Sequence, residues 1–272
     1  MTKLIAFAAA TLTAVVQAAS AQSAPVDNYR STLVNGLTPD PIVWNGRTWR
    51  AYVRSNRVPG LDYSLRLTKH RARFELRPEE FRGVFPTKRA ELGGSLSKYP
   101  RLPNSKVLWG AMSFIHHPWA ASMKPTSGCV MLQIHMGSKA GGSPAFALRR
   151  GTDGHIKVTT NAEKPNGTPT GSETRYDAPL SFGQKHDLVY RIVLGGYGKP
   201  GEVKAWIDGR QVVGLAGTSL IGHRNAEHYA NVGAYCAGGV TTPIVAEIGN
   251  FVYPSVADLS GRIARPPAWP SD

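Results

Sequence analysis

Three short segments, far apart in the chain, place polar side chains on one face of an expected β-strand. Successive side chains of a strand point to opposite faces, so residues an even number of positions apart share a face. The pairs that share a face in this way are Arg89 with Glu91, Gln133 with His135, and Tyr229 with Tyr235. Together they would offer a cation, an amide, an imidazole and a phenol. Such a set can neutralise a carboxylate, remove a proton from a neighbouring carbon and protonate a leaving oxygen.

Each segment also has a purely structural interpretation. Arg89 and Glu91 could form a cross-strand charge pair at the surface, which contributes little to stability. Gln133 and His135 lie within the apolar run 130–136, where buried polar side chains need hydrogen-bond partners. Tyrosines are common in strands. The combination of the three segments, rather than any single one, favours a catalytic site.

The same segments resemble the motifs of the jelly-roll polysaccharide lyases, the group of alginate lyases, glucuronan lyases and heparin lyase I. Those families carry an R-x-E-L strand, a Q-x-H strand and a Y-x-K-x-G-x-Y strand, in that order. The corresponding segments are 89–92, 133–135 and 229–235. The resemblance covers roughly residues 60–255. With L-W-G at 108–110 and V-K-A-W-I-D-G at 203–209, it is nearest to the heparin-lyase-I-like and glucuronan-lyase sequences.

The resemblance implies a division of roles in β-elimination from a uronic acid. The proton at C5 is only weakly acidic while the adjacent carboxylate keeps its charge, so Arg89 and Gln133 would neutralise that carboxylate. His135 would act as the base or assist it, and Tyr235 would be the acid, or both acid and base. The residues expected to bind substrate around them are Glu91, Tyr229, Asn231, Arg73, Arg77 and His117.

Two details of the motifs leave alternatives open. Asn231 stands where the family has Lys, and loss of that cation would make the neighbouring phenol less acidic or change the preferred substrate. The segment Arg73-Phe74-Glu75-Leu76-Arg77 is a second candidate for the first motif. We favour Arg89, because its separation from Gln133 is closer to that of the family and the earlier segment resembles the strand that precedes the motif.

The elements that must position these residues are many short strands bounded by Gly, Pro, Asn and Asp. No segment shows apolar helical periodicity over three turns. Helical turns are expected only at 78–85 and 258–262, and the Pro-rich tail 265–270 is expected to be an extended strap with Trp269 packed on the body. The strands are predicted within 63–77 and at 107–116, 128–136, 145–149, 156–160, 188–194, 203–207, 211–213, 229–235 and 245–253, with a hairpin turn at Asp208-Gly209. This pattern predicts an all-β fold: a single β-jelly roll, a concanavalin-like sandwich of two curved antiparallel sheets with a concave substrate groove.

The first residues read as a secretory signal peptide. Lys3 supplies a positive start, 4–16 is mostly apolar, and Ala19-Ser20-Ala21 fits an A-x-A cleavage site. We therefore expect a signal peptide at 1–21, a single domain at 22–272 in which the Pro-, Asn- and Gly-rich segment 22–48 wraps the body, and a periplasmic or secreted protein. The formal net charge is +14, and removal of Lys3 with the signal leaves 14 − 1 = +13. A basic excess favours anionic partners, although solubility alone could also explain it.

The chain has two cysteines, Cys129 and Cys236. In an oxidising compartment they could pair, but simple alternation puts Cys129 on the face of Gln133 and His135, and Cys236 on the face opposite Tyr235. Pairing then requires a bulge, so the sequence is compatible with either a disulfide or two free thiols. Two cysteines without a second cluster do not form a zinc site, and no metal site is expected.

The sequence thus predicts a lyase that cleaves a uronic-acid-containing anionic polysaccharide, such as alginate, glucuronan or a heparin-like glycan. Neither an obligatory metal nor an organic cofactor is implied, and calcium binding is left open. The basic residues are scattered and form no nucleic-acid motif, so we expect neither nucleic acid nor a membrane as a partner, and a monomer. The alternatives are a non-catalytic carbohydrate-binding jelly roll and, less favoured because no strand carries closely spaced acids, a glycoside hydrolase.

Overall fold

The structure, a computed structural model, describes residues 42–52, 63–78, 89–94, 101–121, 128–137, 144–236 and 238–271. The predicted signal peptide and all but the first residue of the predicted helical turn at 78–85 lie outside these residues. None of the helices in the described ranges is long and apolar enough to cross a membrane.

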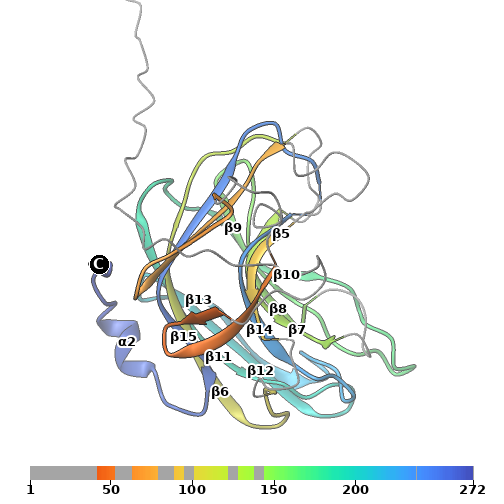
Figure 1. Cartoon of the computed structure of the whole chain (residues 1–272). Helices are drawn as coiled ribbons and strands as arrows, with labels where there is room; N and C mark the ends of the chain where they lie inside the picture. Colours follow the sequence, from red (N-terminus) through yellow and green to blue (C-terminus); the bar gives the residue numbers. More distant parts are fainter. Residues whose placement is uncertain are drawn as a thin grey trace, which may run out of the picture.

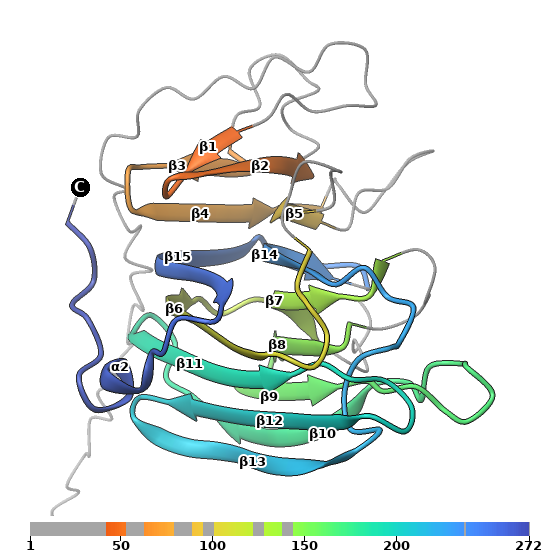
Figure 2. The ribbon, with the colours of Figure 1, turned by 90° about the horizontal axis from the view of Figure 1, so that it is seen from below.

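The described strands form two antiparallel sheets that lie face to face (Figures 1 and 2). The first is eight-stranded, in the order β1-β2-β5-β14-β7-β8-β9-β10, and the second is seven-stranded, in the order β13-β12-β11-β6-β15-β4-β3. The bounds in the first sheet are β1 (Ile42–Trp44), β2 (Arg47–Tyr52), β5 (Arg89–Gly93), β14 (Tyr229–Cys236), β7 (Cys129–His135), β8 (Phe146–Arg150), β9 (His155–Thr160) and β10 (Glu173–Pro179). Those in the second are β13 (Arg210–Thr218), β12 (Pro200–Ile207), β11 (Lys185–Val193), β6 (Val107–His116), β15 (Ile244–Ser255), β4 (Arg71–Leu76) and β3 (Leu65–Leu67). The predicted jelly roll is confirmed.

The predicted strands are confirmed, most of them with shifted ends, and two further regions are strands that the sequence did not predict. β1 and the start of β2 fall in the segment expected to wrap the body, and they are joined by a hairpin turn at Asn45 (φ 50°) and Gly46 (φ 68°). β10 carries few apolar residues because it is an edge strand whose side chains are mostly exposed. The Asp208-Gly209 hairpin is confirmed, with φ of 51° and 79°, the left-handed geometry that such turns require.

The core fills the space between the sheets with the inward side chains of both. Phe146 of β8 stacks on Tyr190 of β11, with ring centroids 4.9 Å apart, and so joins the two layers. Gly110 of β6 makes this possible, because a Cβ there would lie 2.3 Å from the Tyr190 ring. At the β1–β2 edge, an aromatic cluster that packs against β15 closes the sandwich; its members are Trp44, Trp49, Phe251 and Tyr253.

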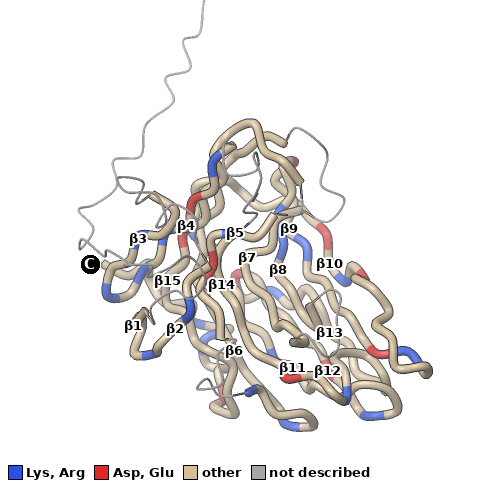
Figure 3. Tube along the Cα trace, turned by 45° about the vertical axis from the view of Figure 1, so that its right-hand side comes forward, with Lys and Arg blue, Asp and Glu red and all other residues tan. Residues whose placement is uncertain are grey.

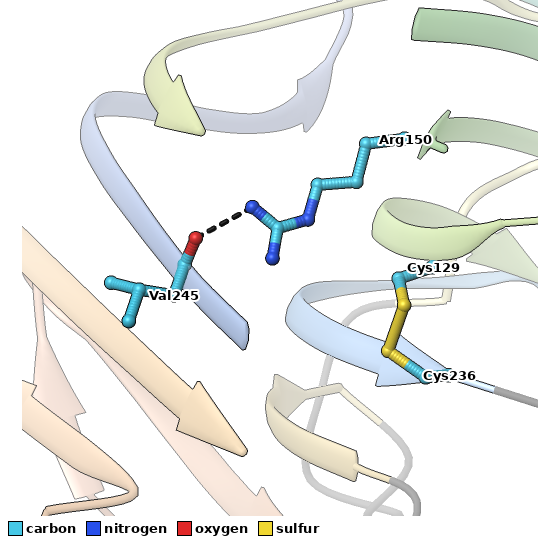
Figure 4. Close-up of a disulfide and its surroundings, with 4 residues drawn as sticks. All are labelled: Cys129, Arg150, Cys236 and Val245. Atoms are coloured by element: carbon cyan, nitrogen blue, oxygen red, sulfur yellow. Dashed lines mark hydrogen bonds between the residues drawn. A yellow bond between two sulfur atoms is a disulfide. The ribbon is translucent and has the colours of Figure 1, made fainter. Parts of the chain in front are cut away.

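Cys129 and Cys236 form a disulfide between β7 and β14, with Cα atoms 4.3 Å apart (Figure 4). The expectation that Cys129 shares a face with Gln133 and His135 is wrong. Val130 pairs with Arg149 and Leu132 pairs with Leu148, although Arg149 and Leu148 are consecutive. Met131 is therefore an extra residue in β7, which forms a β-bulge against β8. This bulge reverses the alternation and turns Cys129 toward the core, where Cys236 also points.

Arg150 of β8 also connects the two sheets near the disulfide (Figure 4). Its side chain is fully buried, and Nη1 donates a hydrogen bond of 2.6 Å to the carbonyl of Val245 in β15. Burial lowers the pKa of this guanidinium to about 9. Arg150 therefore belongs to the core, whereas its neighbour Arg149 points to the opposite face of the sheet.

The chain ends with a short helix, α2 (Ser260–Ala264), and an extended tail beside the second sheet (Figure 1). Arg262 donates to both carboxylate oxygens of the buried Asp187 in β11, at 3.0 and 2.7 Å. The carbonyls of Pro267 and Ala268 accept hydrogen bonds from Lys185 and Asn250. Trp269 lies against Gly249 of β15, so the expected strap is confirmed.

Candidate active site

The three polar segments form adjacent strands of the eight-stranded sheet, in the spatial order β5-β14-β7. Along each strand, apolar residues such as Leu92, Val232 and Ile134 alternate with the polar ones and belong to the core. The polar side chains therefore point to the opposite face of the sheet. Two rows of laterally paired residues cross this face: Arg89–Tyr235–Val130 and Gly93–Asn231–Gln133. A third pair, Tyr229 with His135, lies beside the second row. The structure therefore brings together Arg89, Glu91, Gln133, His135, Tyr229, Asn231 and Tyr235.

Glu91 and Gln133 form the floor of this cluster. Both side chains are almost fully buried, and the Gln133 amide donates a hydrogen bond of 2.7 Å to Oε1 of Glu91 across the central strand β14. β14 has Gly233 opposite Glu91, with φ of 145°, and a Cβ there would lie 2.3 Å from the carbonyl of Ala90. Glycine is therefore required at this crossing point.

Burial raises the pKa of Glu91 to about 7, against the opposing effects of Arg89 and of the Gln133 hydrogen bond. The Arg89 Nε lies 3.9 Å from Oε2, at the limit of an ion pair. Oε2 has no hydrogen-bond partner among the described residues. The Glu91 carboxyl thus keeps its proton to a higher pH than an ordinary glutamate.

We expect a pH-dependent stability from Glu91. The folded protein holds this proton more tightly than the unfolded chain, so the stabilisation is complete below the unfolded pKa near 4.5 and is lost as the pH rises through about 7. The loss amounts to about 3 kcal/mol. Glu91→Gln keeps an acceptor for Gln133 but cannot ionise. Denaturant unfolding between roughly pH 4 and pH 8 should show the variant gaining stability over wild type as the pH rises, and a constant difference would contradict this.

Arg89 is held between two aromatic rings. Its guanidinium carbon lies 4.4 Å from the centroid of the Tyr235 ring and 5.4 Å from that of Tyr52 in β2. Cation–π contacts of this kind restrict the orientation of a side chain that is still 37% exposed. The exposed part of the guanidinium is available to an anionic ligand beside the Tyr235 ring.

His135 is positioned by its own strand end and by Tyr229. Its ring stacks on that of Tyr229, with centroids 5.1 Å apart, and Nδ1 accepts a hydrogen bond of 2.9 Å from the backbone N–H of Gly137. Burial, and secondly Arg89, lower the pKa of His135, so the imidazole is neutral at pH 7. A neutral ring whose Nδ1 accepts carries its proton on Nε2. His135 thus presents an N–H donor to the site. Burial raises the pKa of the neighbouring Tyr229 to about 12, so that phenol is neutral as well.

Arg73, Arg77 and His117 are not brought to this cluster. Arg73 and Arg77 both form ion pairs with Glu75, on or just after β4 in the seven-stranded sheet. His117 lies after β6 and bonds to Glu247 of β15, at 2.9 Å. Ala72 and Phe74, which alternate with Arg73 and Glu75 along β4, are in the core. Arg73 and Glu75 therefore lie on the outer face of the seven-stranded sheet, on the side of the sandwich opposite the cluster.

Two residues of the cluster were not predicted. Tyr52 reaches it because β2 pairs with β5, placing Tyr52 directly opposite Glu91. Arg149 reaches it because β8 pairs with β7, placing Arg149 opposite Val130. Alternation within the segments W-R-A-Y and F-A-L-R predicts that Tyr52 and Arg149 point away from the apolar face of their strands. Neither segment indicates which strands are its neighbours in the sheet, so their place in the cluster could not be predicted. Within the described ranges, no three His, Cys, Asp or Glu side chains gather in an arrangement that could hold a metal ion.

Comparisons with known proteins agree with this fold. The endo-β-1,4-glucuronan lyase of the fungus Trichoderma reesei has the same fold, with a TM-score of 0.52 at 14% identity over 86% of this chain and 96% of that one. Alginate lyase A1-II′, a member of polysaccharide lyase family 7, matches with a TM-score of 0.51 at 15% identity over 72% and 84%. A His-to-Asn, Tyr-to-Phe variant of that enzyme, solved in complex with the substrate GGMG, matches with a TM-score of 0.50 at 12% identity over 71% and 81%. No curated protein shows a significant sequence match.

The two-sheet sandwich is the fold of the jelly-roll polysaccharide lyases. The chain belongs to the family described as Polysaccharide lyase, which matches residues 46–247. It is therefore an enzyme of the lyase class that acts on a polysaccharide.

Proposed function

We propose that this lyase cleaves a uronic-acid-containing anionic polysaccharide by β-elimination, using Arg89, Gln133, His135 and Tyr235. The observation that carries the proposal is the meeting of these four side chains on one face of three adjacent strands. Nothing in such a set supplies the pair of flanking carboxylates that hydrolysis of a glycosidic bond uses, since Glu91 is its one carboxylate among the described residues.

The substrate carboxylate is the group that the site must neutralise first. Arg89 offers a partly exposed guanidinium, and Gln133 lies on the floor beside it with a buried amide. The Nε2–H of neutral His135 is a third donor. These groups stabilise the enolate-like intermediate that forms when the C5 proton leaves, because they are donors held on one face of the sheet before the charge develops.

Tyr235 then serves as both base and acid. Its phenolate takes the proton from C5, the C4–O4 bond breaks as the C4–C5 double bond forms, and the phenol returns the proton to the leaving O4. His135 does not need to accept a proton in this scheme, which agrees with the hydrogen bond that occupies Nδ1. The tyrosine is regenerated as phenolate, so protons and electrons balance over one turnover.

Charge and the disulfide support an exported enzyme with an anionic substrate. Lys and Arg are distributed over both sheets and their loops (Figure 3), and the whole chain carries a formal charge of +14. A positive field of this kind attracts polyanions without forming a nucleic-acid motif. The buried disulfide is typical of oxidising compartments, as expected for a periplasmic or secreted protein.

We expect the purified protein to produce unsaturated uronic-acid ends from one member of a panel of alginate blocks, glucuronan, heparin, heparan sulfate and hyaluronan. Ultraviolet absorbance measures this product directly, because the new double bond is conjugated with the carboxylate. Tyr235→Phe is the matched control and should give no absorbance. New reducing ends without absorbance would indicate hydrolysis. Binding of a polymer without either product would indicate a carbohydrate-binding jelly roll, which the Asn231 substitution would then explain.

A further inference from the structure

Arg149 extends the row of residues that contains Tyr235. Across four adjacent strands, β5-β14-β7-β8, the laterally paired residues are Arg89, Tyr235, Val130 and Arg149. The residue of β7 between Tyr235 and Arg149 in this row is the apolar Val130. Arg149 is buried, with 6% of its surface exposed, and its Nε donates a hydrogen bond of 3.0 Å to Thr159 of β9, which holds the side chain on this face.

The charge of Arg149 has no acidic partner within the described ranges: its hydrogen bond is to the hydroxyl of Thr159. The neighbouring cations differ in this respect. Arg89 lies near Glu91, and Lys157, the next residue of the row in β9, pairs with Asp177 at 2.9 Å. Burial lowers the pKa of Arg149, and the charge interaction with Tyr235 opposes that effect. A buried guanidinium without a carboxylate gains most when a negative charge forms nearby.

The central strand lacks the cation that the motif of related lyases carries. Asn231 occupies that position, pairs laterally with Gln133 and Gly93, and is almost fully buried. Its amide cannot stabilise a phenolate by charge. Since the proposed elimination requires a phenolate, positive charge near Tyr235 must come from neighbouring strands, from Arg89 of β5 over the ring and from Arg149 of β8.

We propose that Arg149 supplies from β8 the positive charge that Asn231 cannot supply from β14, so that Tyr235 works between two guanidiniums. This inference rests on the proposed function only where it concerns turnover. Arg89 lies over the phenol ring and near Glu91, whereas Arg149 stands in the same row on the other side of β7 from Tyr235. Arg149 acts through Tyr235 and is a positioning residue, not a group that exchanges protons with the substrate.

Two measurements on Arg149→Gln test this. The charged and titratable groups that share this face of the sheet with Tyr235 include Arg89 and Glu91 of β5, Tyr52 of β2, His135 of β7, Tyr229 of β14 and Arg149 of β8. Because several of them influence the rate, the first measurement is spectroscopic: the ultraviolet titration of tyrosinate, taken as the difference between each protein and its Tyr235→Phe derivative. We expect the midpoint of this difference in Arg149→Gln to move up by about one pH unit.

The second measurement is the pH profile of kcat/KM on the substrate that the panel identifies. In Arg149→Gln we expect the ascending limb of the profile to shift to higher pH. The rate at neutral pH should fall about tenfold, because one pH unit is a factor of ten in the phenolate fraction. Arg149→Lys should keep most of the rate. The double variant Arg149→Gln/Asn231→Lys should recover part of it by returning the cation to β14. Lys157→Gln, one strand further along the row, is the matched control and should match wild type in both measurements.

The outcomes separate this inference from the proposed function. A higher KM with unmoved profile and titration would make Arg149 a substrate-binding residue and overturn the inference. An unmoved titration in a folded, inactive Arg149→Gln would assign it a purely structural role. If Arg149→Gln does not fold, Asn231→Lys in the wild-type background should lower the titration midpoint, and no change would count against the inference. If wild type attacks no polymer but the titration shift is found, the proposed function fails and the Arg149–Tyr235 coupling stands.

Discussion

Tyr235→Phe should lose about 10² to 10⁴ in turnover through loss of the proton-transfer group, and His135→Ala about 10² to 10³ through loss of a stabilising donor, while the fold is retained. Phenylalanine preserves the ring over which Arg89 lies and removes only the hydroxyl that carries the proton. Alanine at 135 removes the Nε2–H donor and leaves the Gly137 N–H without its acceptor. Both losses are measured by the rate of ultraviolet absorbance increase at saturating substrate.

The same assay distinguishes the two candidate arginines. Arg89→Ala and Gln133→Ala should each lose about 10² to 10³ through weaker stabilisation of the intermediate. Arg73→Ala should stay near wild type, because Arg73 pairs with Glu75 on the other sheet. Activity that disappears in Arg73→Ala and persists in Arg89→Ala would show that the first motif is the earlier segment. Full activity in both Tyr235→Phe and His135→Ala would refute the mechanism.

Removal of the disulfide by Cys129→Ala/Cys236→Ala should lower the free energy of unfolding by about 4 to 5 kcal/mol. The bond closes a loop of 107 residues, and a cross-link of that span removes much of the conformational entropy of the unfolded chain. Both sulfur-bearing side chains are buried, so the fold shields the bond from reductants until the protein opens.

Denaturant unfolding with and without a thiol reductant measures this effect. We expect the unfolding midpoint of wild type under reducing conditions to fall to near that of the double variant, and reductant to leave the variant unchanged. Equal midpoints for oxidised and reduced wild type would show that the bond does not stabilise the fold. Because Cys236 follows Tyr235 directly in β14, turnover at temperatures below the unfolding transition should also be recorded for the double variant.

Local patterns were enough to assign most strands. The run 107–116 and the alternating segment around Phe74 each carry their own signal, since burial of one face demands apolar residues at every second position. β10 carries no such signal because, at the edge of its sheet, it buries little. The hairpin at Asn45-Gly46 has a recognisable turn sequence, but it lay in a segment interpreted from composition as a wrap.

The sequence by itself determined which residue types were available to the site and that Arg89, Gln133, His135 and Tyr235 lie on expected strands. Tertiary structure alone decided which strands are neighbours, and therefore that Arg149 and Tyr52 belong to the cluster while Arg73, Arg77 and His117 do not. It also placed the bulge at Met131 that reverses the face of Cys129 and allows the disulfide. The physical reason is that alternation is a local property of the backbone. Pairing between distant strands depends on long-range packing, and one added residue reverses every side chain beyond it.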